Sequence, residues 1–202
     1  MQVEDDMKTT RQLPKKTDVG TRPQLYRLKV TLLNSKPPIW RRLRVHGDTT
    51  LAGLHAILQV AMGWLDSHLH TFEVHGITYA DPDPEWHPPV SDERGPTLTG
   101  LGLVTGSRFT YEYDMGDGWR HEIVVEAVTD AETARPRRAA CIAGRRACPP
   151  EDVGGIGGYA YFLEAIRDSN HKEHKDMMDW IGKEFDPEAF SVAETDQALE
   201  EL

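Results

Sequence analysis

The sequence contains only two cysteines, Cys141 and Cys148, among its 202 residues. Two cysteines cannot supply the disulfide framework of a small secreted protein, so we expect free thiols and a cytoplasmic location. No run of about 18 apolar residues occurs, so no membrane-spanning helix is expected. The first six residues, Met-Gln-Val-Glu-Asp-Asp, include three acidic residues and no apolar stretch follows them, so we expect no secretory signal.

Motifs that commonly carry catalysis or bind metal are also missing. The sequence has no Cys-x-x-Cys and no His-x3-His, and its glycine-rich stretch at 154–158 lacks the Lys-Ser/Thr pair of a phosphate-binding loop. No nucleophile, base and orienting group can be grouped from the sequence. The residues therefore favour a protein that is not an enzyme over one that is.

The charge of the chain is unevenly distributed. The net charge is −10, yet residues 1–50 contain 11 Lys/Arg against 5 Asp/Glu. Residues 151–202 contain 4 Lys/Arg against 14 Asp/Glu. An acidic chain is a poor general coat for nucleic acid, but a local basic surface remains compatible with this distribution.

Alternating apolar and polar residues predict two β-hairpins. Residues 25–32 and 39–45 have a period of two and are joined by a loop containing Pro37 and Pro38. Residues 109–113 and 119–125 alternate in the same way around an Asp-Gly turn. A further strand is expected at 68–74, whereas 80–96 and 130–158 are read as irregular.

Helical periodicity predicts one well-defined helix at 50–62, with a cap in Asp48-Thr49-Thr50 and Gly63 at its end. Shorter helices are expected at 159–167, 175–184 and 193–202. The resulting fold class is α+β, a β-grasp-like (ubiquitin-like) mixed sheet of about five strands with one packed helix and additional C-terminal helices. We divide the chain into a flexible leader at 1–23, an α+β domain at 24–190 and an acidic helix or tail at 191–202.

Several segments in one order resemble the plasmid pRiA4b ORF-3-like family. They are Lys36-Pro-Pro-Ile-Trp-Arg-Arg42, Ala61-Met-Gly-Trp64, His68-Leu-His70-x-Phe72, Tyr111-x-Tyr-Asp-x-Gly-Asp-Gly-Trp-x-His121, Cys141 to Gly155, and Trp180 to Phe190. The resemblance covers roughly 24–190. It implies association with plasmids and mobile elements, and a label as resolvase-like passenger, but it transfers no catalytic residue.

A histidine–aspartate set is the candidate metal site. His68 and His70 are two residues apart on a predicted strand, so their imidazoles would face the same side. Neighbouring strands could bring further ligands to a divalent metal, and the full candidate set is His68, His70, Asp114, Asp117 and His121. With such an ion the protein would be a metal-dependent hydrolase or nuclease. The alternative is that the aspartates only shape a tight turn and the histidines only make structural hydrogen bonds.

A basic hairpin face is the candidate partner-binding site. It consists of Arg27, Lys29, Trp40, Arg42 and Arg44. An arginine-rich segment from Arg135 to Arg146 could add to it, or could instead pair with the acidic C-terminal part of the same chain. The hypothesis we favour is a non-catalytic binding module for a charged protein partner or for self-association. A nucleic acid, with Trp40 stacked on a base, is a weaker alternative.

Overall fold

The structure is a computed structural model that describes residues 23–82, 89–131, 137–182 and 184–202. The predicted leader at 1–23 therefore falls outside the described residues except for Pro23. No helix in these ranges is both long and apolar enough to span a bilayer.

One eight-stranded sheet forms the body of the protein, in the order β5-β4-β3-β6-β7-β1-β2-β8. All neighbouring strands are antiparallel except the parallel pair of β4 and β5, so the sheet is mixed. The strands are β1 Gln24–Leu32, β2 Trp40–His46, β3 His70–Val74, β4 Ile77–Ala80, β5 Ser91–Asp92, β6 Arg108–Tyr113, β7 Trp119–Asp130 and β8 Ala139–Arg145.

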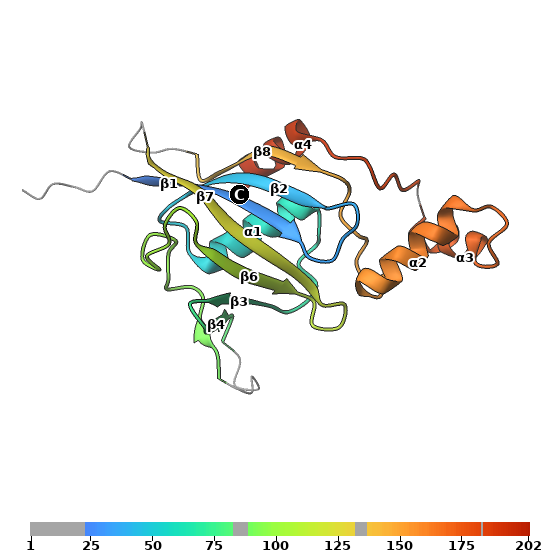
Figure 1. Ribbon diagram of the computed structural model, residues 1–202, viewed down its shortest axis with the longest axis horizontal. Helices are drawn as coiled ribbons and strands as arrows, with labels where there is room; N and C mark the ends of the chain where they lie inside the picture. The colour runs from blue at the N-terminus through green and yellow to red at the C-terminus, as the bar shows by residue number, and fades with distance from the viewer. Residues whose placement is uncertain (1–22, 83–88, 132–136, 183) are drawn as a thin grey trace, which may run out of the picture.

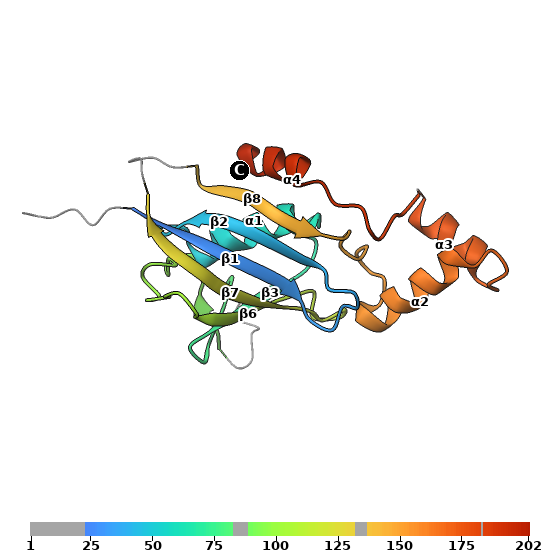
Figure 2. The same cartoon turned by 45° about the horizontal axis from the view of Figure 1, so that its top comes forward.

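Within the described ranges, four α-helices accompany the sheet. They are α1 Leu51–Met62, α2 Gly155–Arg167, α3 His174–Ile181 and α4 Val192–Ala198, and a short 3-10 helix follows at Leu199–Glu201. Helix α1 crosses one face of the sheet, α4 lies beside β8, and α2 and α3 extend away from the end of the sheet (Figures 1 and 2). The mixed α+β class and both predicted hairpins are confirmed.

The predicted number of about five strands is wrong, because the sheet has eight strands. Strand β8 lies in a segment that was read as irregular, and β4 and β5 extend the opposite edge. The strand order does not confirm the β-grasp label. His68 lies just before β3, which begins at His70.

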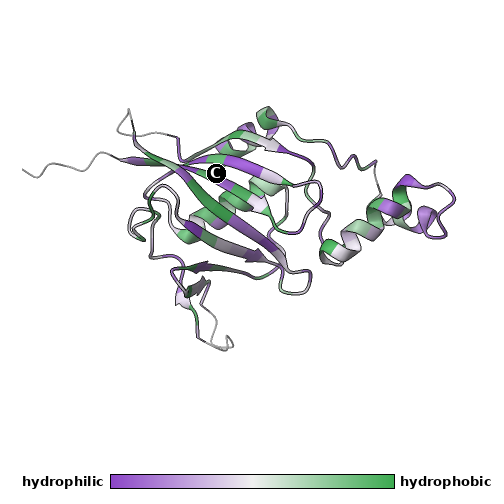
Figure 3. Cartoon of the chain, in the orientation of Figure 1, coloured by the Kyte–Doolittle hydropathy of each residue, from purple (hydrophilic) through white to green (hydrophobic). Residues whose placement is uncertain are grey.

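Helix α1 has the caps that its sequence predicts. The hydroxyl of Thr50 accepts a hydrogen bond from the Gly53 amide at 3.1 Å, and Gly63 closes the helix in the left-handed region at φ 93°. Its inner residues are buried with the inward-facing residues of the strands in one core, and Figure 3 shows hydrophobic segments along α1 and the sheet. The largest fully buried side chain is Trp119, and Tyr26, Phe72, Tyr111 and Tyr113 surround the same core. This single core fixes the ends of the strands where the candidate site residues lie.

Candidate functional site

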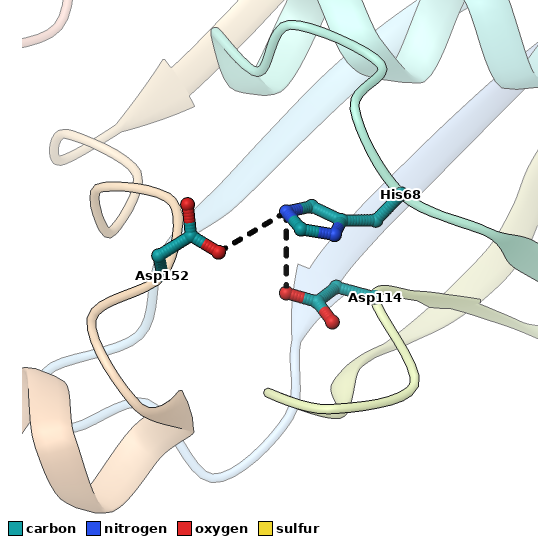
Figure 4. Close-up of side chains that lie close together, drawn as sticks. All are labelled: His68, Asp114 and Asp152. Carbon is teal, nitrogen blue, oxygen red and sulfur yellow. Dashed lines mark ion pairs between the residues drawn. The ribbon is translucent and has the colours of Figure 1, made fainter.

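The five residues predicted to bind metal do not all lie together. His68 and Asp114 are neighbours, and Asp152 joins them from the loop before α2 (Figure 4). The Nε2 atom of His68 lies 3.3 Å from Oδ1 of Asp152 and 3.7 Å from Oδ2 of Asp114. All three ligand atoms lie within 4.8 Å of one another, and His70, Asp117 and His121 are outside this group.

His70 belongs to a different cluster, which the sequence did not reveal. Its ring stacks on that of His55 with centroids 3.4 Å apart, and its Nε2 atom is 2.8 Å from Oε2 of Glu93. His55 bonds to Asp66 and to the hydroxyl of Tyr111. Burial lowers the pKa of His55, and a charge on His70 would lower it further. These contacts give both imidazoles structural partners.

His121 is fully buried, with its ring edge-on to that of Trp64 at 5.4 Å between centroids. Neither ring nitrogen has a well-aligned hydrogen-bond partner among the described residues. Desolvation is the main reason why the pKa of His121 falls to about 4. The side chain is therefore a neutral core residue at physiological pH.

The turn between β6 and β7 holds the two predicted aspartates. Asp114 has a φ of 57°, and its Oδ1 atom accepts hydrogen bonds from the amides of Gly116 and Asp117. Asp117 accepts a hydrogen bond from the Gly154 amide at 3.1 Å and so joins this turn to the start of α2. Both aspartates thus shape the turn, and Asp114 also keeps its Oδ2 atom directed at His68 (Figure 4).

The predicted basic face lies on the side of the sheet opposite to α1. In Figures 1 and 2 the strands stand in front of α1, and none of the labelled helices crosses this outer face. The ring of Trp40 has the Lys29 ammonium 5.7 Å and the Arg42 guanidinium 5.2 Å from its centre. The Arg42 guanidinium donates a bidentate pair of hydrogen bonds to the carboxylate of Glu126 on β7. Glu126 also forms an ion pair with Arg27. Glu126 therefore neutralises part of the positive charge of this face.

The arginines of the arginine-rich segment have different partners, and Arg135 lies outside the described residues. Arg145 is exposed and lies opposite Trp40 in the β2–β8 ladder, so its side chain shares the outer face. Arg137 pairs with Asp196 and Glu200, and Arg146 pairs with Glu188. The alternative of pairing with the acidic C-terminal part is thus correct for Arg137 and Arg146. Arg145 instead extends the basic face.

The comparisons with known proteins agree with the resemblance found in the motifs. The model of the family described as plasmid pRiA4b ORF-3-like protein matches residues 24–194. The uncharacterized protein y4hQ of Sinorhizobium fredii is 38% identical over 178 residues, which are 87% of this chain and 91% of that protein.

A solved relative has the same fold. The crystal structure of the protein of unknown function MM3350 from Methanosarcina mazei Go1 superimposes with a TM-score of 0.75 at 34% identity. The match covers 86% of this chain and 98% of the other. From the matched family model, the identity to y4hQ and this shared fold, the chain belongs to the plasmid pRiA4b ORF-3-like family.

Proposed function

We propose that the protein is a non-catalytic binding module that holds an acidic protein surface on the open sheet face around Trp40. The observation that carries the proposal is the position of this ring. It is half-buried between Lys29 and Arg42, opposite Arg145, on a face that α1 leaves free. An aromatic ring flanked by cations offers apolar contact and charge in one place, as interface centres commonly do.

The charges of the outer face support an anionic partner. On the β6–β7 half, Arg108 pairs with Glu122 and Arg120 pairs with Glu112, so the cations there are balanced. The β1, β2 and β8 half presents five cations, of which two pair with Glu126 of β7; the five are Arg27, Lys29, Arg42, Arg44 and Arg145. Lys29, Arg44 and Arg145 have no carboxylate within 4.0 Å in the described ranges. A compact anionic surface of a partner can neutralise these three cations without approaching the acidic remainder of the chain, which would repel it.

The thiols give no support to a nucleophilic enzyme. Burial raises the pKa of Cys141 and raises that of Cys148 strongly, so neither is poised as a thiolate. A long polyanion such as a nucleic acid would also meet the acidic remainder of a chain with a net charge of −10. These two features favour a local protein contact over catalysis or nucleic-acid coating.

The double charge reversal Lys29→Glu with Arg44→Glu tests the proposal. Both side chains lack ion-pair partners in the described structure, so their replacement breaks no internal salt bridge. We expect the affinity for labelled polyglutamate, measured by fluorescence anisotropy at about 50 mM salt, to fall about tenfold or more. Binding by the wild type should weaken steeply at about 200 mM salt.

The matched control is Lys172→Glu with Lys175→Glu, which changes the net charge equally but lies at α3, away from the sheet face (Figure 1). This control should bind like the wild type. Equal affinities of the two double variants would contradict the proposal. A parallel titration with oligothymidylate separates the alternatives, because tighter binding that Trp40→Ala abolishes would identify a nucleic acid as the partner.

A further inference from the structure

Three potential metal ligands from distant parts of the sequence meet at the end of the sheet. His68 precedes β3, Asp114 follows β6, and Asp152 lies in the loop before α2 (Figure 4). We propose that these three side chains bind a divalent transition-metal ion, with Zn²⁺ the best match. This site is separate from the basic face around Trp40, so either proposal can fail alone.

The distances suit a small ion. Zinc lies about 2.0–2.2 Å from nitrogen and carboxylate ligands, so tetrahedral geometry places neighbouring ligand atoms roughly 3.3–3.5 Å apart. The His68 nitrogen is 3.3 Å from the Asp152 oxygen and 3.7 Å from the Asp114 oxygen. The His68–Asp114 distance is slightly longer than this range and the two aspartate oxygens lie within 4.8 Å of each other, so a bound ion would draw the three ligand atoms slightly closer together. A small rotation of the Asp152 side chain, which is 72% exposed, can provide that change.

The inner ligand atoms contact one another but make no well-formed hydrogen bond. The Nε2 atom of His68 is shielded from solvent and has no hydrogen-bond partner among the residues described. The Asp114 side chain is nine-tenths buried, and the turn amides bond to its Oδ1 atom and leave Oδ2 facing His68. A buried polar atom without a hydrogen-bond partner costs free energy, and a bound cation would remove that cost for His68 and neutralise the carboxylate of Asp114.

The negative charge of the carboxylates around the site also favours a bound cation. Asp114, Asp117, Glu151 and Asp152 lie around this end of the sheet, and none of them has a Lys or Arg within 4.0 Å in the part of the chain that is described. Glu151 instead accepts a hydrogen bond from the Tyr113 hydroxyl at 2.8 Å.

The composition of the site selects the class of ion. One imidazole with two carboxylates suits Zn²⁺ and, less tightly, Mn²⁺, because imidazole favours later transition metals. Ca²⁺ prefers six to eight oxygen ligands, which this site does not offer. Three protein ligands would leave a coordination position to water on the exposed side of Asp152. The bound ion would tie the β6–β7 turn to the loop that leads into α2.

Zinc titration of untagged, chelator-treated protein tests the proposal. We expect saturable binding with a stoichiometry of one by calorimetry and a rise in the melting temperature, since a ligand of the folded state stabilises it by mass action. His68→Gln and Asp152→Asn should each weaken binding by about 100-fold or more, because each removes a direct ligand. In ¹⁵N-histidine spectra, Zn²⁺ should shift Nε2 of His68 and leave His70 and His121 unchanged.

The matched control is Asp179→Asn on the exposed surface of α3, which should bind Zn²⁺ like the wild type. Asp152 is exposed, so Asp152→Asn should fold normally, and a circular dichroism spectrum checks this. Absence of saturable binding by the wild type would overturn the proposal. Unchanged affinity in folded Asp152→Asn, or a shift of His70 in place of His68, would overturn it as well.

Discussion

Replacement of Gly158 by alanine is expected to destabilise the protein by about 2 kcal/mol or more, one of the largest effects of any single methyl group in this chain. A Cβ atom at Gly158 would lie 1.9 Å from the carbonyl oxygen of Val153. The obstacle is backbone and not the flexible end of a side chain, so α2 would have to move. Because α2 buries Phe162 and Leu163 in the common core, its displacement reduces the free energy of unfolding.

The neighbouring glycine is the control for this prediction. A Cβ at Gly157 meets no atom within 4 Å, and the residue lies in the same turn of α2. Gly157→Ala should therefore stabilise the protein by roughly 0.5–1 kcal/mol through the helix preference of alanine. Urea unfolding followed by tryptophan fluorescence measures both variants. Equal free energies of unfolding for the two alanine variants would show that α2 does not press against Val153.

The second prediction concerns the pH dependence of stability. Burial lowers the pKa of His121 to about 4, whereas an unfolded histidine titrates near 6.5. Between these values the unfolded state binds the proton and the folded state does not, so stability falls as the pH decreases from about 6.5 to 4. The complete loss amounts to about 3 kcal/mol, of which roughly 2 kcal/mol is expected between pH 7.5 and pH 5.

His121→Leu should remove the contribution of His121 to this dependence, while that of His55 remains. Both ring nitrogens lack aligned partners in the described structure, so an apolar side chain of similar size leaves no new unpaired group. We expect the variant to match or exceed the wild type at pH 7.5 and to exceed it by roughly 2 kcal/mol at pH 5. Urea unfolding at both pH values gives the comparison. A parallel loss of stability in both proteins would mean that His121 is already protonated in the folded state.

Local sequence patterns predicted the helices and strands whose formation depends on residues close together in the sequence. The two hairpins follow from period-two alternation, and α1 follows from its capping residues and apolar spacing. Strand β8 could not be read this way, because residues 139–145 are rich in alanine and glycine and lie among arginines and prolines. That strand exists because β2 offers an open edge, which is a property of the assembled sheet.

The candidate sites also divide into residues that local sequence patterns predict and residues that only the folded structure brings together. The face containing Arg27, Lys29, Trp40, Arg42 and Arg44 follows directly from alternation in one hairpin, whereas Arg145 joins it only through β8. His68 and Asp114 could be suggested as neighbours from strand ends. Asp152 could not, because its approach depends on how the loop before α2 packs against the β6–β7 turn. The stack of His55 on His70 likewise joins a helix to a strand and leaves no local signal.

The most direct test of the proposed function is to map the contact with an acidic partner onto the sheet. Backbone amide spectra of labelled protein would be recorded while polyglutamate is added at low salt. The proposal predicts shifts in β1, β2 and β8 around Lys29, Trp40 and Arg145, with α2 and α3 unchanged. Shifts confined to other elements, or none at concentrations where the probe binds, would contradict a binding module built on this face.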